Sequence, residues 1–141
     1  MNTTAVEALL LEHDVKPTPQ RMVITQFVVG SREHPTAEDV HRAVRHHLPV
    51  ALSRATVYNT LNILVHSGVI KEVVAEPGCT RYDANLEKHH HFIDTKSGKI
   101  VDIPWNSVPE LSSRPLKGKY KVNRYQITFY GELESGDHRR T

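Results

Sequence analysis

The histidines and aspartates between residues 83 and 102 have the types and spacing of metal ligands. His89 and His91 stand two apart, so on a β-strand both side chains point to one face while His90 points to the other. Asp83 ends a predicted strand before this run, and Asp102 ends a neighbouring one. The two aspartates and the first and third histidines can therefore converge on one ion.

His34 stands just before a predicted helix and can reach the same ion from the N-terminal half. Three imidazoles and two carboxylates form a borderline-to-hard ligand set without thiolate. This set suits Fe²⁺ or Mn²⁺ with five or six ligands and also accepts Zn²⁺. The alternative for three consecutive histidines is a surface cluster that binds metal only adventitiously. Spacing alone leaves both interpretations open.

Size and composition exclude several other classes. The 141 residues suit one domain or two small ones, each with a modest core. No run of about 18 apolar residues is present, and the acidic first 14 residues do not resemble a secretory signal, so no membrane association is expected. The single cysteine, Cys79, excludes an intrachain disulfide, and a reducing cytoplasm is the expected location. The role of this cysteine stays open.

Charge is distributed unevenly although the net charge is only +2. No acidic residue lies between Asp39 and Glu72, a stretch that also contains four histidines and the cations Arg42, Arg45, Arg54 and Lys71. A local basic surface of this kind can meet nucleic-acid phosphates. A mildly basic solvated face is the alternative.

Hydrophobic periodicity predicts four helices in the first half. The first follows the apolar spacing from Val6 to His13, and the fourth ends at Gly68. The apolar stripe of the third continues to Leu48 and stops at Pro49. Capping residues begin the second, third and fourth helices, namely Thr18, Thr36 and Ser53.

After Gly68 the pattern changes to short strands. They are expected at 69–74, 80–83, 92–93, 99–103 and 125–133. Helices followed by a β-hairpin are typical of a winged helix, in which the fourth helix would be the recognition helix. The second half has too few apolar residues to be stable alone and is expected to pack against a second copy.

The predicted fold class is therefore α+β. A winged helix-turn-helix DNA-binding domain is expected at 1–84 and a small α/β dimerisation and metal-binding domain at 85–134. The polar tail, 135–141, is expected to be disordered.

The expected solvent face of the fourth helix carries side chains that can read DNA. Tyr58 can press its ring on a thymine methyl, and Asn59 and Asn62 can read adenine edges in the major groove. Arg54 suits a phosphate or a guanine. The alternative is an ordinary solvated helix face.

Several motifs, in one order along the chain, resemble those of the ferric uptake regulator (Fur) superfamily. The resemblance covers nearly the whole chain, from about Val15 to Leu133. Its motifs are Thr18-Pro19-Gln20-Arg21, His34-Pro35-Thr36-Ala37, Ala55-Thr56-Val57-Tyr58-Asn59-Thr60-Leu61, Arg81-Tyr82-Asp83 before the three histidines, Gly98-Lys99-Ile100-Val101-Asp102 and Phe129-Tyr130-Gly131.

This resemblance implies a homodimeric, metal-dependent repressor of palindromic operators, with an N-terminal winged helix, a hinge and a C-terminal dimerisation domain. The regulatory metal site of the family maps onto the residues found above by spacing, namely His34, Asp83, His89, His91 and Asp102. The DNA contacts of the family imply Lys16 at a phosphate or in the minor groove, and Tyr58 and Asn59 in the major groove.

The branch within the family is indicated by the two carboxylates. Asp83 and Asp102 stand where iron-sensing members usually have glutamate, which resembles the peroxide-sensing PerR branch. In that branch bound Fe²⁺ reacts with peroxide and oxidises a ligand histidine, here His34 or His89 by position. The three histidines and residues 101–104 also resemble a haem-responsive branch, whose N-terminal Cys-Pro motif is missing here. Iron or haem sensing without peroxide chemistry therefore stays open.

Two features depart from the family pattern. Most members hold a structural zinc with two Cys-x-x-Cys pairs, but here Asp94 and Ser97 replace the first pair and no cysteine follows Cys79, so no structural zinc is expected. A second metal site of some members also differs, because its positions hold Lys88, His90 and Tyr125, and a lysine repels a cation.

Two other functional classes remain as alternatives. A histidine and aspartate site can also activate water or oxygen in a non-haem metalloenzyme, or store metal in a buffering protein. No general base or substrate-binding motif stands out, and either class would leave the helical half unexplained. The sequence therefore predicts a regulator and not an enzyme.

Overall fold

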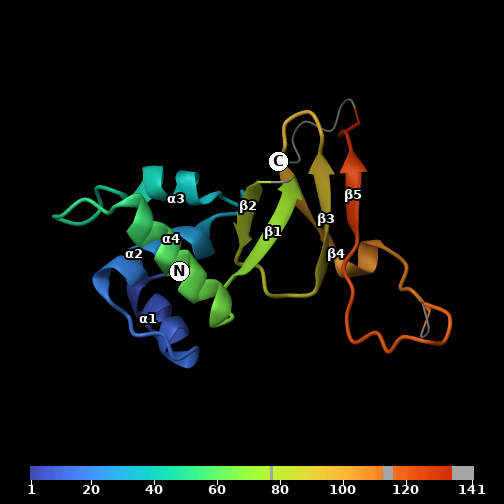
Figure 1. Cartoon of the computed structure of the whole chain (residues 1–141), viewed down its shortest axis with the longest axis horizontal. Helices are drawn as coiled ribbons and strands as arrows, with labels where there is room; N and C mark the ends of the chain where they lie inside the picture. The colour runs from blue at the N-terminus through green and yellow to red at the C-terminus, as the bar shows by residue number, and fades with distance from the viewer. Residues whose placement is uncertain (77, 113–115, 135–141) are drawn as a thin grey trace. The chain divides into compact units, whose positions relative to one another are not determined.

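The computed structural model describes residues 1–76, 78–112 and 116–134 and divides into two compact units, Met1–Leu86 and Glu87–Thr141 (Figure 1). The first unit contains four helices and a β-hairpin, and the second contains a three-stranded sheet. The chain has the α+β class that the sequence predicts. No helix among the described residues is long and apolar enough to cross a membrane. The predicted tail, 135–141, lies outside the described residues.

The helices of the first unit are α1 (Thr3–Glu12), α2 (Pro19–Gly30), α3 (Ala37–Val44) and α4 (Arg54–His66). Each begins after a residue whose side-chain oxygen accepts the backbone N–H three residues on, which satisfies a donor left open at the helix end. These capping residues are Asn2, Thr18, Thr36 and Ser53. The three caps that the sequence predicts are thus confirmed.

Helix α3 is shorter than predicted. It ends at Val44, whereas the apolar stripe led us to expect helix as far as Leu48. The residue before Pro49 is sterically biased away from helical backbone, and the chain turns back so that Leu52 N–H donates to Arg45 O at 3.0 Å.

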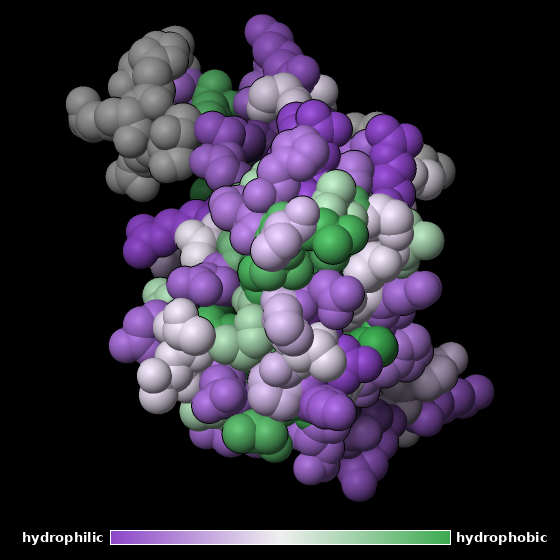
Figure 2. All heavy atoms as spheres, turned by 90° about the vertical axis from the view of Figure 1, so that its left-hand side faces the viewer, coloured by the Kyte–Doolittle hydropathy of each residue, from purple (hydrophilic) through white to green (hydrophobic). Residues whose placement is uncertain are grey.

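Aliphatic side chains form one continuous core in the first unit. Burying each such side chain contributes about 1.5–3 kcal/mol to folding. Fully buried members include Val6, Leu10, Ile24, Val28, Val40, Val57, Leu61 and Leu64. The face of this unit at the left of Figure 1 is largely hydrophilic, with smaller hydrophobic areas between the polar side chains (Figure 2).

Strands β1 (Lys71–Glu76) and β2 (Cys79–Asp83) form the antiparallel hairpin of the first unit. The strand predicted from Val69 begins two residues later. The N–H groups of Val69 and Ile70 both point to Leu64 O, at 2.9 and 3.4 Å, and so finish α4 instead of starting the ladder.

The sheet of the second unit has the strand order β4-β3-β5. Strand β3 (His89–Asp94) is antiparallel to β4 (Ile100–Pro104) and parallel to β5 (Thr128–Gly131), and a short 3₁₀ turn, η1 (Trp105–Ser107), follows β4. Strand β3 is longer than the predicted 92–93, and β5 is shorter than the predicted 125–133. Just before β5, Ile127 N–H donates to the His90 ring at 2.9 Å and not to a strand carbonyl, although Ile127 O still accepts the N–H of His91 at 3.0 Å.

Candidate metal centre and DNA-binding face

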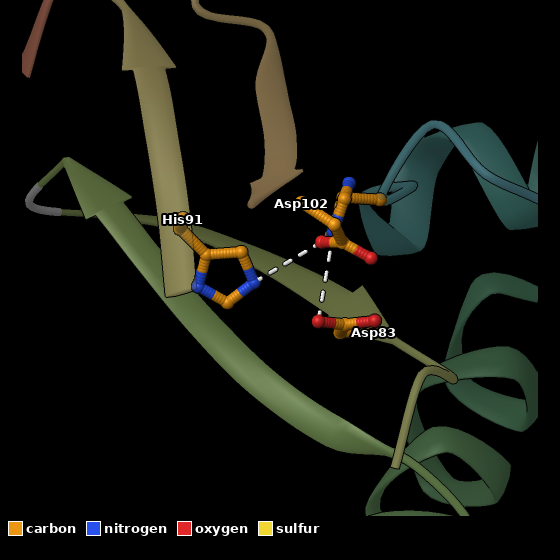
Figure 3. A group of neighbouring side chains, drawn as sticks. Asp83, His91 and Asp102 are labelled. Atoms are coloured by element: carbon orange, nitrogen blue, oxygen red, sulfur yellow. Dashed lines mark ion pairs between the residues drawn. The ribbon is translucent and has the colours of Figure 1, made fainter. Parts of the chain in front are cut away.

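Strands β3 and β4 bring three predicted ligands together in the second unit. His91 lies directly opposite Asp102 in the antiparallel register, so their side chains share one face of the sheet, and His89 joins them because it stands two residues before His91. Both rings are buried, with 5% and 2% of their surface exposed. The Asp102 side chain keeps 33% of its surface accessible. Figure 3 shows His91 and Asp102 pointing toward each other from their two strands.

The spacing of these three side chains is that of ligands around one ion. His89 Nε2 lies 3.1 Å from His91 Nε2, and Asp102 Oδ1 lies 3.5 and 3.4 Å from the two nitrogens. Atoms bound about 2.1 Å from a metal lie about 3.0 Å apart at right angles and about 3.4 Å apart at tetrahedral angles. The donor set of the second unit therefore fits a divalent transition metal.

The tautomer of His89 is set by its surroundings. Its Nδ1 lies against the carbonyl oxygen of Glu87, and since a carbonyl only accepts, Nδ1 carries the proton. In that tautomer the lone pair is on Nε2, the atom that faces His91 and Asp102. Hydrogen bonds of this kind orient histidine ligands in metal sites.

The first unit contributes two further predicted ligands that contact each other. His34 Nε2 lies 3.6 Å from Asp83 Oδ2, and both side chains are buried. Asp83 ends β2, as predicted, and its Oδ1 accepts the N–H of Asn85 at 2.9 Å. The five predicted ligands thus form two groups, a pair in the first unit and a triad in the second.

His34 has an unusual backbone conformation. Its φ is +51°, in the left-handed region that only glycine and a few polar residues enter readily. Such a conformation costs on the order of 1–3 kcal/mol and persists only when the surroundings impose it. Periodicity and motif reasoning do not reveal this feature.

His90 points to the opposite face of β3, as predicted, and packs on an aromatic cluster. Its ring stacks on Trp105 at 4.3 Å between centroids, Tyr125 lies 4.9 Å from the same indole, and Lys88 Nζ lies 4.0 Å above it. Burial, and after it the neighbouring histidines, lower the pKa of His90, so the ring is neutral and its Nδ1 accepts the N–H of Ile127. The three positions of the family's second metal site therefore surround an indole in this chain.

The residues at the positions of the first Cys-x-x-Cys pair hold a tight turn. Asp94 accepts the N–H of Lys96 at 3.0 Å and the hydroxyl of Ser97 at 2.9 Å. Gly98, at a φ of +76°, donates its N–H to Asp94 O at 2.7 Å. These hydrogen bonds hold the turn that connects β3 to β4.

Helix α4 exposes the side chains that the sequence predicts for DNA. Its inward face is buried, whereas Tyr58, Asn59 and Asn62 are exposed. Arg54 is exposed as well, but its guanidinium lies 3.5 Å from the carboxylate of Glu38. Lys16 is exposed in the segment before α2.

The chain is similar to known proteins over most of its length. The model of the ferric uptake regulator family matches residues 12–130. The chain is 36% identical over 124 residues to the peroxide operon regulator of Bacillus subtilis, covering 86% of this chain and 84% of that one. It is 32% identical to the peroxide-responsive repressor PerR of Staphylococcus epidermidis, covering 88% and 83%.

Solved structures show the same fold. A zinc-bound manganese uptake regulator superposes with a TM-score of 0.72 at 26% identity, covering 92% of this chain and 98% of that one. PerR from Streptococcus pyogenes, described in connection with peroxide sensing, gives a TM-score of 0.51 at 28% identity, covering 93% of this chain and 90% of that one. The family match spans most of the sequence, and the chain therefore belongs to the ferric uptake regulator family.

Proposed function

We propose that this protein is a cytoplasmic, metal-dependent transcriptional repressor that binds palindromic operator DNA as a homodimer. The observation that carries the proposal is the convergence of His89, His91 and Asp102 at metal-ligand spacing in a chain of this family. The repressor role is supported by two relatives, a peroxide operon regulator and a peroxide-responsive repressor. We assign DNA binding to residues 1–84 and dimerisation to residues 85–134.

One ion is proposed to take ligands from both units. His34 and Asp83 would come from the first unit, and the triad would come from the second. Fe²⁺ and Mn²⁺ suit this nitrogen and carboxylate set, and Zn²⁺ would also bind. Because the ligands belong to two units, a shared ion restrains one unit against the other.

This restraint gives metal a way to control DNA binding. In a dimer, two recognition helices read successive major grooves when they stand about 34–36 Å apart, which is one turn of DNA. Metal binding would favour that arrangement, and by thermodynamic linkage DNA would tighten metal binding by the same factor. Tyr58, Asn59 and Asn62 are the proposed base readers, and Lys16 and Arg54 the proposed phosphate contacts.

The second unit has the surface expected of a dimerisation domain. Phe129 and Tyr130 of β5 expose 41% and 62% of their surface, and β5 is an edge of the sheet. Exposed aromatic side chains on a sheet edge favour association with another chain. A second copy would cover them.

The signal is proposed to be hydrogen peroxide. When bound, Fe²⁺ supplies the reducing electron that peroxide chemistry needs, and His34 and His89 are the rings expected to gain oxygen. Aspartate at both carboxylate positions and the peroxide-responsive relatives support this branch.

DNA binding is the first test. Double-stranded DNA selected from a random pool on Mn²⁺-loaded protein should bind in a mobility shift assay with Mn²⁺ and not with a chelator. His89→Ala should abolish this dependence while leaving a folded dimer, and His13→Ala, which changes a histidine outside both ligand groups, should not. A His89→Ala variant that responds fully to Mn²⁺ would show that the ligand assignment is wrong. Absence of DNA binding under all conditions would favour a metalloenzyme or a metal-buffering protein.

Peptide mass spectrometry tests the signal. After loading with Fe²⁺ or Mn²⁺ and adding peroxide, one added oxygen is expected on the His34 or His89 peptide with iron only. Unmodified histidines in protein shown to hold iron would instead support reversible iron sensing. Absorbance in the Soret region after addition of haem would support haem sensing.

A further inference from the structure

The backbone that carries His34 is attached to strand β2 by main-chain contacts. Thr36 forms an antiparallel bridge with Arg81, and Tyr82 N–H donates to Pro35 O at 2.9 Å. The left-handed His34 is therefore the first residue of a segment held against the hairpin.

The side chains of β2 hold His34 in two different ways. Arg81 and Asp83 stand two apart and share one face of the strand, while Tyr82 points to the other face and is buried in the core. Arg81 Nη1 donates to the backbone oxygen of His34 at 3.1 Å, and Asp83 lies 3.6 Å from the His34 ring. One strand face thus fixes both the backbone and the imidazole of the same residue.

The Arg81 side chain is placed at some cost to stability. Its Nε is buried and has no hydrogen-bond partner among the described residues. An unsatisfied buried donor destabilises a fold, so the guanidinium is poorly explained as a purely stabilising group. The hydrogen bond from Arg81 to the His34 carbonyl suggests a different role, which is to hold the His34 backbone in place.

We propose that Arg81 is a positioning residue for the metal site: it holds His34 in the left-handed conformation that directs the imidazole to Asp83. The inference rests on the proposed metal function and adds a residue to it. In this account the two ligands of the first unit are already ordered before metal arrives. Partners of this kind typically change metal affinity about 10- to 100-fold.

Arg81→Met tests the proposal because two explanations predict opposite signs. If Arg81 positions His34, the variant should bind Mn²⁺ about 10- to 100-fold more weakly than the unaltered protein. If its charge merely repels a nearby cation, the variant should bind Mn²⁺ more tightly. Affinity is measured by titration calorimetry on the full chain, with Arg81→Lys expected to recover part of the loss.

The matched control is Arg21→Met. Arg21 Nη1 also donates to a backbone oxygen, that of Lys16 at 3.1 Å, in the same unit but away from any proposed ligand. Its Mn²⁺ affinity should equal that of the unaltered protein. In metal-free protein, amide hydrogen exchange at Tyr82 should accelerate in Arg81→Met and stay unchanged in Arg21→Met, because this amide reports the attachment of the His34 segment.

A double-mutant cycle with His34→Ala separates the inference from the proposed function. Once the His34 ring is gone, adding Arg81→Met should change Mn²⁺ affinity no further. If His34→Ala weakens Mn²⁺ binding but Arg81→Met does not, the positioning role is wrong and the metal site stands. If His34→Ala itself binds Mn²⁺ normally, the proposed site fails, and the role of Arg81 fails with it.

Discussion

The two units bury different kinds of side chain. The buried core of the first unit is mostly aliphatic, with side chains such as Leu10, Ile24 and Leu64 fully excluded from solvent. In the described part of the second unit, the buried residues are three histidines and two isoleucines, namely His89, His90, His91, Ile93 and Ile100. Hydrophobic burial therefore accounts for much of the stability of the first unit, whereas the described part of the second unit buries more imidazole rings than aliphatic side chains.

The largest expected effect comes from opening the aliphatic core. Leu61→Ala should lower the free energy of unfolding of the first unit by about 2–5 kcal/mol, because Leu61 is fully buried in α4. Helical circular dichroism reports this unit, and the fluorescence of Trp105, the single tryptophan, reports the second. In metal-free protein the helical transition should shift and the tryptophan transition should stay. Equal shifts of both transitions would show that the units unfold as one.

Metal should raise the stability of the second unit, which contains three of the proposed ligands. At a free Mn²⁺ concentration about 100 times the Kd, the folded state should gain about 2.7 kcal/mol, visible as a higher midpoint of the tryptophan transition. His91→Ala should remove this gain because it deletes a buried ligand of the triad. A Mn²⁺-dependent shift that persists in His91→Ala would place the ion elsewhere.

Acid should weaken the metal effect before it weakens the fold. Imidazoles bind metal only when neutral, so Mn²⁺ affinity should fall as acid protonates the ligand histidines. Titration calorimetry at a series of pH values from mildly acidic to neutral measures this fall. A flat profile would exclude imidazole ligands.

The smallest expected effect concerns a helix end in the first unit. Burial would raise the pKa of Asp39, but hydrogen bonds from Thr36 and Arg42 outweigh it and lower that pKa. The ionised carboxylate therefore stabilises the fold above the ordinary titration range near pH 3.9, and the contribution is lost as pH falls through the lowered pKa. Asp39→Asn should cost about 0.5–1 kcal/mol at pH 7 in chemical denaturation, with no difference in strong acid. A deficit that is independent of pH would contradict this origin.

Local signals predicted much of the first unit. The caps at Thr18, Thr36 and Ser53 are confirmed because a cap depends on residues only three positions apart. The end of α3 was predicted wrongly because the apolar spacing continues to Leu48 after the helix has ended at Val44.

The second unit was predicted less completely because its contacts are distant in sequence. The common face of His89 and His91 follows from the two-residue period of a strand, and that part of the prediction needed no fold. The stacking of His90 on Trp105 depends on how β4 is followed by η1. A distant contact escaped prediction in the first unit as well, because the bond from Arg81 to His34 spans 47 positions and no periodic pattern encodes it.

The stoichiometry of Mn²⁺ binding tests the shared ion most directly. Titration calorimetry should give one regulatory Mn²⁺ per chain, and the pair Asp83→Asn in the first unit and Asp102→Asn in the second should each weaken the binding of that same ion. Because only one ion is involved, the calorimetric titration of the double variant should show no loss of a second Mn²⁺ compared with either single variant. Retention of one Mn²⁺ when either unit is altered, and loss of both ions only in the double variant, would show two separate sites and contradict the account.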